Sequence, residues 1–337
     1  MKIDGGLGFG GNLAGVAEQI QKLEAQGYHG AMTAETSSDP FFPLVLAAEH
    51  SERIELMTSI AVAFARNPMV LAGVGHDLNA YSKGRFILGL GSQIKPHITR
   101  RFSMPWSHPA ARMREFILAM RAVWDCWYQG EKLDFRGEFY QHTLMTPMFT
   151  PSDIEFGPPR VFLAAVGPLM TQAAGEVADG LIAHAFTTEK YFRAVTLPNL
   201  EKGLAKAGRS RDGFEVSCPV FVVTGRDEES TAASRLGITR QIAFYGSTPA
   251  YRPVLEAHGW GELGPELTAL SKRGEWNTMG TLITDEILEA FAIVASPKDV
   301  PDRLLERYGG LIDRVACTFD IGDGAERESA MAKLQAG

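Results

Sequence analysis

Three stretches of this chain combine small and polar residues in an order that could hold a ligand. The first is Gly89-Leu90-Gly91-Ser92-Gln93, from which the chain continues to His97. An apolar strand whose end is nearly bare of side chains lets something flat or anionic lie against its backbone. Glycines at such spacing also occur where a strand only packs closely or bulges. His97 is therefore either a ligand contact or a solvated loop residue.

The second stretch is Ala165-Val166-Gly167, which Pro168 and a helical pattern follow. Small residues before a helix leave backbone N–H groups free to hold an anion, and the helix dipole assists them. The same residues suit a tight strand-to-helix turn that holds no ligand. Phosphate binding and a plain turn are both open at this point.

The third group contains charged residues at two other expected strand ends, Glu35 with Thr36, and Arg66. A carboxylate at a strand end can act in catalysis, or it can accept backbone N–H bonds. Arg66 is either a clamp on a ligand or an ion-pair partner for an acidic side chain. Residue type alone does not decide between these roles.

Several motifs of other chemistries are missing from the sequence. There is no His-x-x-x-His, no Gly-x-Ser-x-Gly, no Walker loop and no Gly-x-Gly-x-x-Gly that opens a helix in a Rossmann unit. We therefore expect no metal site and no serine hydrolase. His184, near the expected end of a strand, stays a site candidate, whereas four other histidines lie in or beside helical patterns and are expected to be structural: His29, His50, His76 and His258.

Composition narrows the class of protein. The net charge of -7, without a stripe of Lys and Arg, argues against a nucleic-acid partner. No apolar run reaches the ~18 residues of a membrane span. The three cysteines fit no metal or redox spacing, which is typical of small buried residues in a reducing compartment. These features predict a cytoplasmic protein that acts on a small molecule.

The elements that must position these residues alternate between strand and helix along the chain. Helix starts are marked by Asn12, by Asp39-Pro40 and by Asn67-Pro68. We expect an α/β fold, a (β/α)8 TIM barrel in one domain over 1–337. A loop excursion at about 135–159 is expected to cross the barrel mouth, and a mostly helical insertion at about 227–293 to cover it. The expected strands are 2–10, 30–35, 54–62, 86–91, 160–166, 181–185, 214–224 and 314–319.

Several stretches spread over most of the chain resemble the luciferase-like monooxygenase superfamily, and within it the branch of coenzyme F420-dependent oxidoreductases. They are Leu23–Glu35, Arg53–Pro68, Ser82–Ser92, Leu163–Gly180 and Ser296–Phe319. The resemblance implies a luciferase-like barrel with its active site at the carboxyl ends of the strands. It also implies a homodimer that forms through barrel helices.

The resemblance further implies a place for the cofactor. A non-proline cis peptide at Ser59-Ile60 is expected to back the central ring of the deazaflavin. The loop from Ser92 through Gln93 to His97 is expected to line the ring edge. The backbone of Ala165, Val166 and Gly167 is expected to hold the cofactor tail.

One match to the family is imperfect. Glu35 and Thr36 stand where a sugar-phosphate dehydrogenase of this branch has an acidic residue and a catalytic histidine, and threonine cannot act as that base. Either His97, His184 or Glu35 handles the proton, or the reaction needs no strong base. The departure argues against sugar-phosphate oxidation.

These implications give one leading hypothesis and two alternatives. The leading hypothesis is an F420-dependent oxidoreductase that moves a hydride between the deazaflavin and a small organic substrate. The first alternative is an FMN-dependent monooxygenase of the same fold. The second is a non-catalytic flavin-binding protein.

Overall fold

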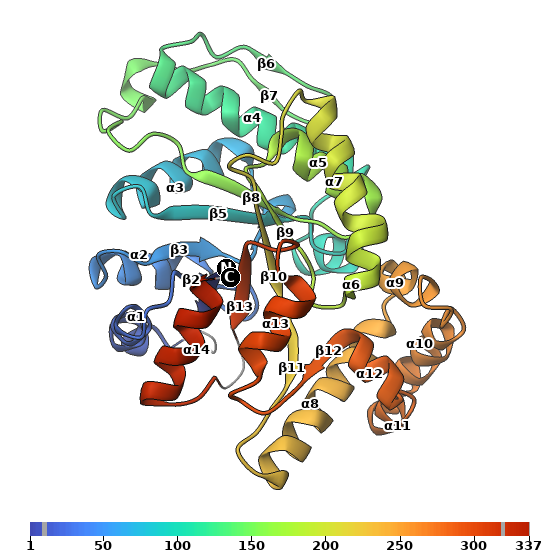
Figure 1. The fold of residues 1–337 in the computed structure, drawn as a ribbon. Helices are drawn as coiled ribbons and strands as arrows, with labels where there is room; N and C mark the ends of the chain where they lie inside the picture. Colours follow the sequence, from blue (N-terminus) through green and yellow to red (C-terminus); the bar gives the residue numbers. More distant parts are fainter. Residues whose placement is uncertain (9–11, 318–320, 337) are drawn as a thin grey trace.

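The computed structural model describes residues 1–8, 12–317 and 321–336, and within them eight parallel strands close into a barrel (Figure 1). Closure is complete because β1 pairs with both β2 and β13, and β3 pairs with β5. The predicted α/β barrel is thus confirmed. Its strands are β1 (Lys2–Gly6), β2 (Gly30–Thr33), β3 (Glu55–Thr58), β5 (Phe86–Gly91), β8 (Arg160–Ala164), β9 (Gly180–Ile182), β10 (Glu215–Pro219) and β13 (Arg314–Cys317).

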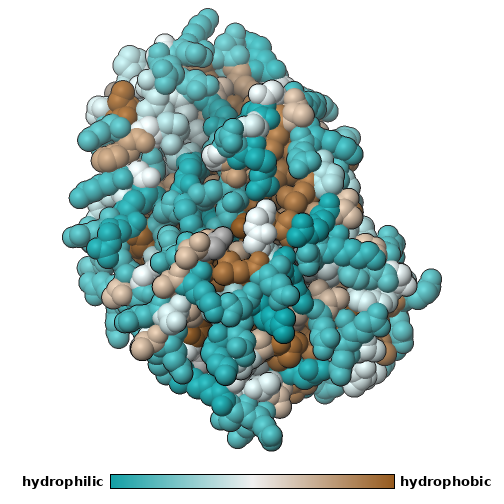
Figure 2. All heavy atoms as spheres, in the orientation of Figure 1, coloured by the Kyte–Doolittle hydropathy of each residue, from teal (hydrophilic) through white to brown (hydrophobic). Residues whose placement is uncertain are grey.

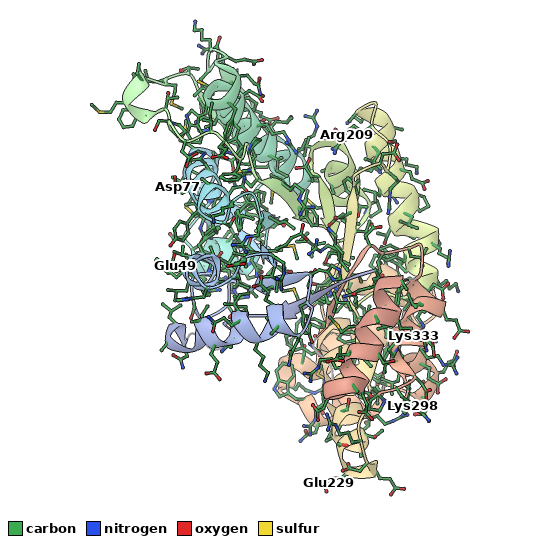
Figure 3. The ribbon with its side chains drawn as sticks, turned by 60° about the vertical axis from the view of Figure 1, so that its left-hand side comes forward. Glu49, Asp77, Arg209, Glu229, Lys298 and Lys333 are labelled. Atoms are coloured by element: carbon green, nitrogen blue, oxygen red, sulfur yellow. The ribbon has the colours of Figure 1, made fainter. Side chains whose placement is uncertain are left out.

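Helices surround the barrel and turn charged side chains outward, as Glu49, Asp77 and Lys333 illustrate in Figure 3. Two predicted caps are confirmed, because the side chains of Asn12 and Asn67 accept backbone N–H bonds at helix starts. The surrounding helices are η1 (Leu13–Gly15), α1 (Val16–Ala25), α2 (Phe41–Glu49), α3 (Pro68–Tyr81), α4 (Pro109–Gln129), α5 (Pro168–Val177), α6 (Glu189–Tyr191), η5 (Phe192–Thr196), α7 (Leu197–Lys206), α13 (Val300–Tyr308) and α14 (Gly324–Ala336). No helix in the described part of the chain is both long and apolar enough to cross a bilayer.

The third barrel strand is interrupted where the sequence predicted one continuous run over 54–62. The hydrogen-bonded strand β3 ends at Thr58, and β4 (Ala61–Val62) pairs with β5 beyond the interruption. The peptide bond between Ser59 and Ile60 is cis, as predicted. The strands predicted at 30–35, 160–166 and 181–185 end before their predicted limits, at Thr33, Ala164 and Ile182. The predicted ends at 9–10 and 318–319 lie outside the described residues.

The excursion after α4 does not cross the barrel mouth, so that expectation is wrong. It contains β6 (Phe135–Arg136), β7 (Gln141–His142) and η4 (Pro147–Phe149). The carboxylate of Glu115 on α4 accepts three consecutive backbone N–H groups of this segment, and Asn79 on α3 donates to the carbonyl of Gly157. These bonds hold the excursion against the outer side of α3 and α4, where Figure 1 shows β6 and β7.

The helical insertion forms a second packed layer at the other end of the molecule (Figure 1). Two strands connect the insertion to the barrel: β11 (Phe221–Val223) precedes it and β12 (Ala292–Val294) follows it. The two strands pair in parallel. Its apolar side chains form a cluster of their own, which includes Phe186 from the loop after β9. The helices are α8 (Glu228–Gly246), η6 (Pro249–Tyr251), α9 (Arg252–Glu256), α10 (Leu263–Arg273), α11 (Trp276–Thr281) and α12 (Asp285–Phe291).

Side chains fill the barrel interior, so the barrel is not a pore. The interior cluster consists of buried apolar residues: Met32, Met57, Ile87, Phe162, Ile182 and Ala316. At the amino-terminal end of the barrel, below this cluster, Arg314 is fully buried and pairs with Asp4 through two hydrogen bonds. The amino-terminal end is thus closed, and the carboxyl ends of the strands are where a ligand can approach.

Candidate active site

The carboxyl ends of β3 and β5 meet in a wall made mostly of main chain. The hydroxyl of Thr58 donates to the carbonyl of Gly89 at 2.7 Å. A Cβ atom at Gly89 would lie 1.7 Å from the carbonyl oxygen of Thr58, and one at Gly91 would lie 2.8 Å from Cδ1 of Ile60. Gly89 is therefore required for the interrupted strand to pack against β5, whereas a side chain at Gly91 would force the side chain of Ile60 to shift. That a flat or anionic ligand lies against this strand end stays a prediction.

Glu35 holds this wall in place from the next strand. Its carboxylate accepts the backbone N–H of Val62 at 2.7 Å and pairs with Arg66, which also contacts Asp39 at 3.0 Å. The backbone N–H of Glu35 donates to the carbonyl of Ile60 at 3.1 Å. Of the alternatives for these residues, the structure shows the structural ones: Glu35 accepts a backbone N–H, and Arg66 is its ion-pair partner. Both of these contacts use Oε2 of Glu35. The pair positions the interrupted strand.

Thr36 and His97 lie in two exposed loops at the same end of the barrel. The carbonyl of Thr36 accepts a hydrogen bond from Arg101, which ends the short helix η3 (His97–Arg101). His97 begins that helix, and its side chain is exposed to solvent. The structure thus brings the loops after β2 and β5 together. A catalytic role for either residue stays a prediction.

Ser92 and Gln93 connect the glycine wall to the loop of His97. The hydroxyl of Ser92 donates to the carbonyl of Gln93 at 3.1 Å. Gln93 has a φ of 58°, and its side-chain oxygen accepts the N–H of Ile94 at 3.1 Å. These local bonds fix the direction in which the chain leaves β5. Both residues are half-buried beside the wall. Their contact with the edge of a cofactor ring stays a prediction.

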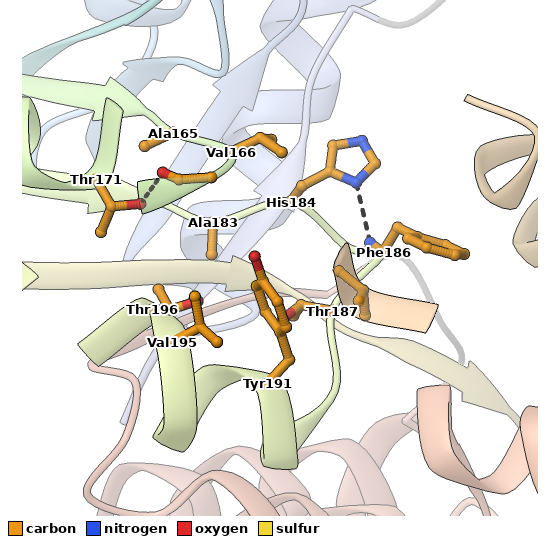
Figure 4. A pocket seen from close by; sticks show the side chains of 12 residues that line it. Ala165, Val166, Thr171, Ala183, His184, Phe186, Thr187, Tyr191, Val195 and Thr196 are labelled. Atoms are coloured by element: carbon orange, nitrogen blue, oxygen red, sulfur yellow. Dashed lines mark hydrogen bonds between the residues drawn. The ribbon is translucent and has the colours of Figure 1, made fainter. Parts of the chain in front are cut away.

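A hollow lies between the ends of β8 and β9 and contains the predicted tail-binding residues (Figure 4). Gly167 has a φ of 78° at the start of α5, and its carbonyl accepts the hydroxyl of Thr171 at 2.9 Å. The Oγ1 atom of Thr187 is buried and has no hydrogen-bond partner within the described residues. The hollow is lined by Ala165, Val166, Gly167, Thr171, Ala183, His184, Phe186, Thr187, Tyr191, Val195, Thr196 and Val254.

His184 stands at the rim of this hollow among aromatic rings. Its Nδ1 accepts the backbone N–H of Phe186 at 3.0 Å. The ring stacks on Tyr251, with centroids 4.5 Å apart at 24°, and meets the edge of Tyr245 at 4.6 Å. Burial in these surroundings lowers the pKa of His184 to about 4. The imidazole is therefore neutral at physiological pH and carries its hydrogen on Nε2.

Sequence reasoning kept His184 as a candidate but missed the two tyrosines around it. Tyr245 lies in the last turn of α8 and Tyr251 ends η6, so both come from the helical insertion. The Thr248-Pro249 pair lies between them and predicts a helix start, which is the local signal available in the sequence. It does not indicate which barrel loop the segment contacts. Only the packing of the insertion on the loop after β9 reveals this contact.

The surface seen in Figure 2 is largely hydrophilic, and its hydrophobic residues gather in small groups rather than in one broad patch. On this face the molecule thus offers no large apolar surface for a partner. The features that could hold a ligand remain those at the strand ends. They are a flat main-chain wall, a hollow with free N–H groups, and a neutral histidine at its rim.

Comparisons with known proteins agree with this arrangement. The chain is 55% identical over 335 residues to an uncharacterised protein of Mycobacterium tuberculosis, covering 99% of this chain and 97% of that protein. It is 28% identical over 285 residues to the 5,10-methylenetetrahydromethanopterin reductase of Archaeoglobus fulgidus, covering 83% and 81%.

The fold is similar to that of the coenzyme F420 dependent tetrahydromethanopterin reductase of Methanopyrus kandleri, with a TM-score of 0.76 and 23% identity, covering 98% of this chain and 97% of that chain. At 23% identity, this structural similarity shows that the two chains share a fold. The model of the luciferase-like monooxygenase family matches residues 1–314. With the barrel closed and its strand ends arranged as described, the chain belongs to the luciferase-like monooxygenase family.

Proposed function

We propose that this protein is an F420-dependent oxidoreductase that transfers a hydride between a deazaflavin and a small organic substrate. The observation that carries the proposal is the flat wall of Gly89 and Gly91 against Ile60, next to the hollow at Gly167. A planar ring fits the first feature and an anionic tail fits the second. The name of the Methanopyrus relative, a coenzyme F420 dependent reductase, supports a deazaflavin.

The residues at the strand ends fit the two parts of such a cofactor. A phosphodiester would meet the free N–H groups at the start of α5 and the unpartnered hydroxyl of Thr187. The ring would lie on the main chain of Ile60 and Gly91, with Ser92 and Gln93 at its edge. A bound deazaflavin supplies or accepts a hydride and does not readily activate dioxygen.

The main contribution of the protein is to orient the bound cofactor and to exclude water from the site. The Glu35–Arg66 pair keeps the wall rigid, so that a ring on it has one orientation. The insertion brings Tyr251 and Val254 over the rim of the hollow, which shields the site from solvent. Phe64 is fully buried beside the wall and meets Trp106 edge-on at 5.7 Å. These aromatic groups give the ring an apolar surrounding.

Titration with both cofactors tests the proposal against its alternatives. We expect purified protein to bind F420, seen as a change in the fluorescence of the deazaflavin, and to bind FMN at least tenfold more weakly. Tight FMN binding with no measurable F420 binding would instead favour the FMN-dependent monooxygenase. A flavin-binding protein without catalysis would bind the cofactor, and the bound reduced form would survive every substrate extract.

Substitution of Gly167 tests where the tail lies. No atom lies within 4 Å of an added Cβ, so Gly167→Glu adds a carboxylate beside the hollow without a clash, although the positive φ strains any side chain at this position. We expect the Kd for F420 to rise at least tenfold through repulsion of the phosphodiester. Gly208→Glu is a matched control, because Gly208 has a φ of 67° and equally open space after α7. Equal Kd values for both variants would place the tail elsewhere.

We also propose that the protein is a cytoplasmic homodimer that folds as one domain. The free thiols of Cys126 and Cys218 are compatible with a reducing compartment. Helices α2 and α3 expose Phe42, Val45 and Val70, which are candidates for a contact between two copies. Light scattering on the wild-type protein and on the Phe42→Glu variant tests the dimer. A wild-type monomer would contradict it.

A further inference from the structure

We infer that the outer face of α8 is an interface at which two copies of this chain pair, helix against the same helix, in antiparallel orientation. The interface is separate from the proposed contact through α2 and α3, and it does not depend on the proposed function. Three features of the structure support it: apolar side chains that the chain leaves exposed, charges that complement a second copy, and small residues between those charges.

The outer face of α8 is a single strip of exposed residues. Because 3.6 residues make one turn, its members lie within about 100° of one another around the helix axis. The buried residues of α8 all lie near its carboxyl end, from Ile242 onward, so most of the helix stands out from the insertion. Figure 3 shows Glu229 at a tip that points away from the barrel. The α8 strip consists of Glu229, Ala233, Leu236, Gly237, Arg240 and Phe244.

Large apolar side chains lie on the α8 strip and are not used by the insertion. Leu236 and Phe244 are each 51% exposed, and neither belongs to the apolar cluster of the insertion. Trp276 on α11 is also 51% exposed, and its ring centroid lies 6.2 Å from that of Phe244. A single exposed apolar residue is common on a protein surface. Three of them along one helix face favour a contact that removes their area from water.

The charges of the α8 strip complement those of a second copy in one orientation. Glu229 and Arg240 are separated by about three turns, so they lie in one line about 16 Å apart. Neither forms an ion pair within the described residues, and Arg240 donates to the amide oxygen of Asn277 at 3.0 Å. In an antiparallel pair Glu229 of each copy faces Arg240 of the other, and the helix dipoles oppose. A parallel pair would bring like charges together.

Small residues lie in the middle of the strip, where the two helices would cross. Ala233 and Gly237 are on either side of the midpoint between Glu229 and Arg240. No atom lies within 4 Å of a Cβ added at Gly237, so α8 presents main chain to solvent there. Small residues at a crossing let two helix axes approach to about 8 Å. Leu236 of each copy then packs on Ala233 of the other.

A second copy is the partner that these features select. A two-fold contact needs a surface that complements itself, and the order of acidic, small and basic residues along the strip has this property. One pair of helices buries a small area, so we expect a weak association with a Kd of about 1–100 µM. The contact joins two dimers if the proposed α2 and α3 contact forms, and two monomers if it does not. In both cases its loss halves the mass of the assembly.

The first experiment measures the mass of the full chain by analytical ultracentrifugation, from well below to well above this Kd. Ala233→Trp places a bulky side chain at the crossing, and Ala205→Trp is the matched control, because Ala205 is exposed on α7. We expect the mass of wild type and control to double over the range, and that of Ala233→Trp to stay at the lower value. Circular dichroism checks that both variants fold. A wild-type mass that does not rise, or association of Ala233→Trp like wild type, would overturn the inference.

The second experiment tests the orientation by exchanging the charges. Glu229→Arg and Arg240→Glu should each raise the Kd of association about tenfold, because each variant creates two like-charge pairs across the two-fold axis. The double variant restores opposite charges at both places, so its Kd should return to within about threefold of wild type. A contact with any other surface would not be restored by this exchange. A double variant as weak as the single variants would therefore refute the antiparallel pairing of α8.

Discussion

The two ends of the barrel are built from opposite kinds of groups. At the amino-terminal end, charged side chains converge on the fully buried Arg314, which pairs with Asp4, Glu55 and Glu215. At the carboxyl end, glycines, small residues and a neutral histidine leave main chain available. The charged groups at the first end pair with one another, whereas at the second end Thr187 Oγ1 has no hydrogen-bond partner among the described residues. Because the ligand site is proposed at the carboxyl end, substitutions at the two ends should have different consequences.

The largest expected effect is the loss of Arg314. Arg314→Ala would leave the carboxylate of Asp4 buried, 1% exposed, without its bidentate partner. We expect the free energy of unfolding to fall by about 3–5 kcal/mol, measured by urea denaturation. Arg136→Ala removes an ion pair with Asp134 whose side chains are 64% and 50% exposed, and should change stability by under about 1 kcal/mol. Equal effects of both variants would refute the contrast between buried and exposed pairs.

Glu55 gives the amino-terminal end an acid-dependent stability. Burial alone would raise the pKa of Glu55, but the charges of Arg314 and Arg160 lower it to about 2. Because the folded pKa lies below the ordinary value of 4.5, this carboxylate stabilises the fold above pH 4.5, and the contribution is lost as the pH falls toward 2. We expect a loss of about 3 kcal/mol from this group across that window. Urea denaturation of Glu55→Gln at several pH values should show a shallower decline than wild type.

His184, at the opposite end of the barrel, should affect the stability of the protein in a different pH range. Its folded pKa of about 4 lies below the unfolded value of about 6.5, so the unfolded chain binds more protons between these values. The stability of the protein should therefore fall as the pH drops from 6.5 to 4, by at most about 3 kcal/mol for this group. His184→Phe should make the decline in that window shallower and leave the decline below pH 4.5 unchanged. Part of the decline should persist, because burial also lowers the pKa of His29, His142 and His258. A decline as steep in the variant as in the wild type would show that His184 does not titrate there.

The sequence alone predicts features that depend on neighbouring residues better than features that depend on contacts between residues far apart in the chain. The closed barrel, the caps of Asn12 and Asn67, and the cis bond at Ser59 follow from local patterns or from the family resemblance, and the structure contains them. The prediction that the excursion crosses the barrel mouth is wrong, because the excursion is held by Glu115 on α4, 24 positions before Phe139 in the chain. The tyrosines around His184 were missed for the same reason.

The same limit applies to the roles of individual site residues. Glu35 stands at a strand end, where a carboxylate can act in catalysis, and nothing in its own segment shows that Arg66 pairs with it. That pairing depends on a contact between residues 31 positions apart. Sequence patterns therefore locate the strand ends that carry the site. They do not show which of the polar side chains there are already engaged by the protein.

The smallest expected effect on stability is at the main-chain wall of the carboxyl end. In Gly91→Ala the added Cβ meets the flexible end of the Ile60 side chain at 2.8 Å, so we expect a loss of about 1 kcal/mol by urea denaturation. F420 affinity should fall at least tenfold, because Ile60 has to shift under the ring of the proposed cofactor. Gly73→Ala, inside α3 with no atom within 4 Å, should instead raise stability by up to about 1 kcal/mol and leave the Kd unchanged. If Gly91→Ala binds F420 like wild type, the wall does not contact the ring, because a shift of Ile60 is unavoidable in this variant.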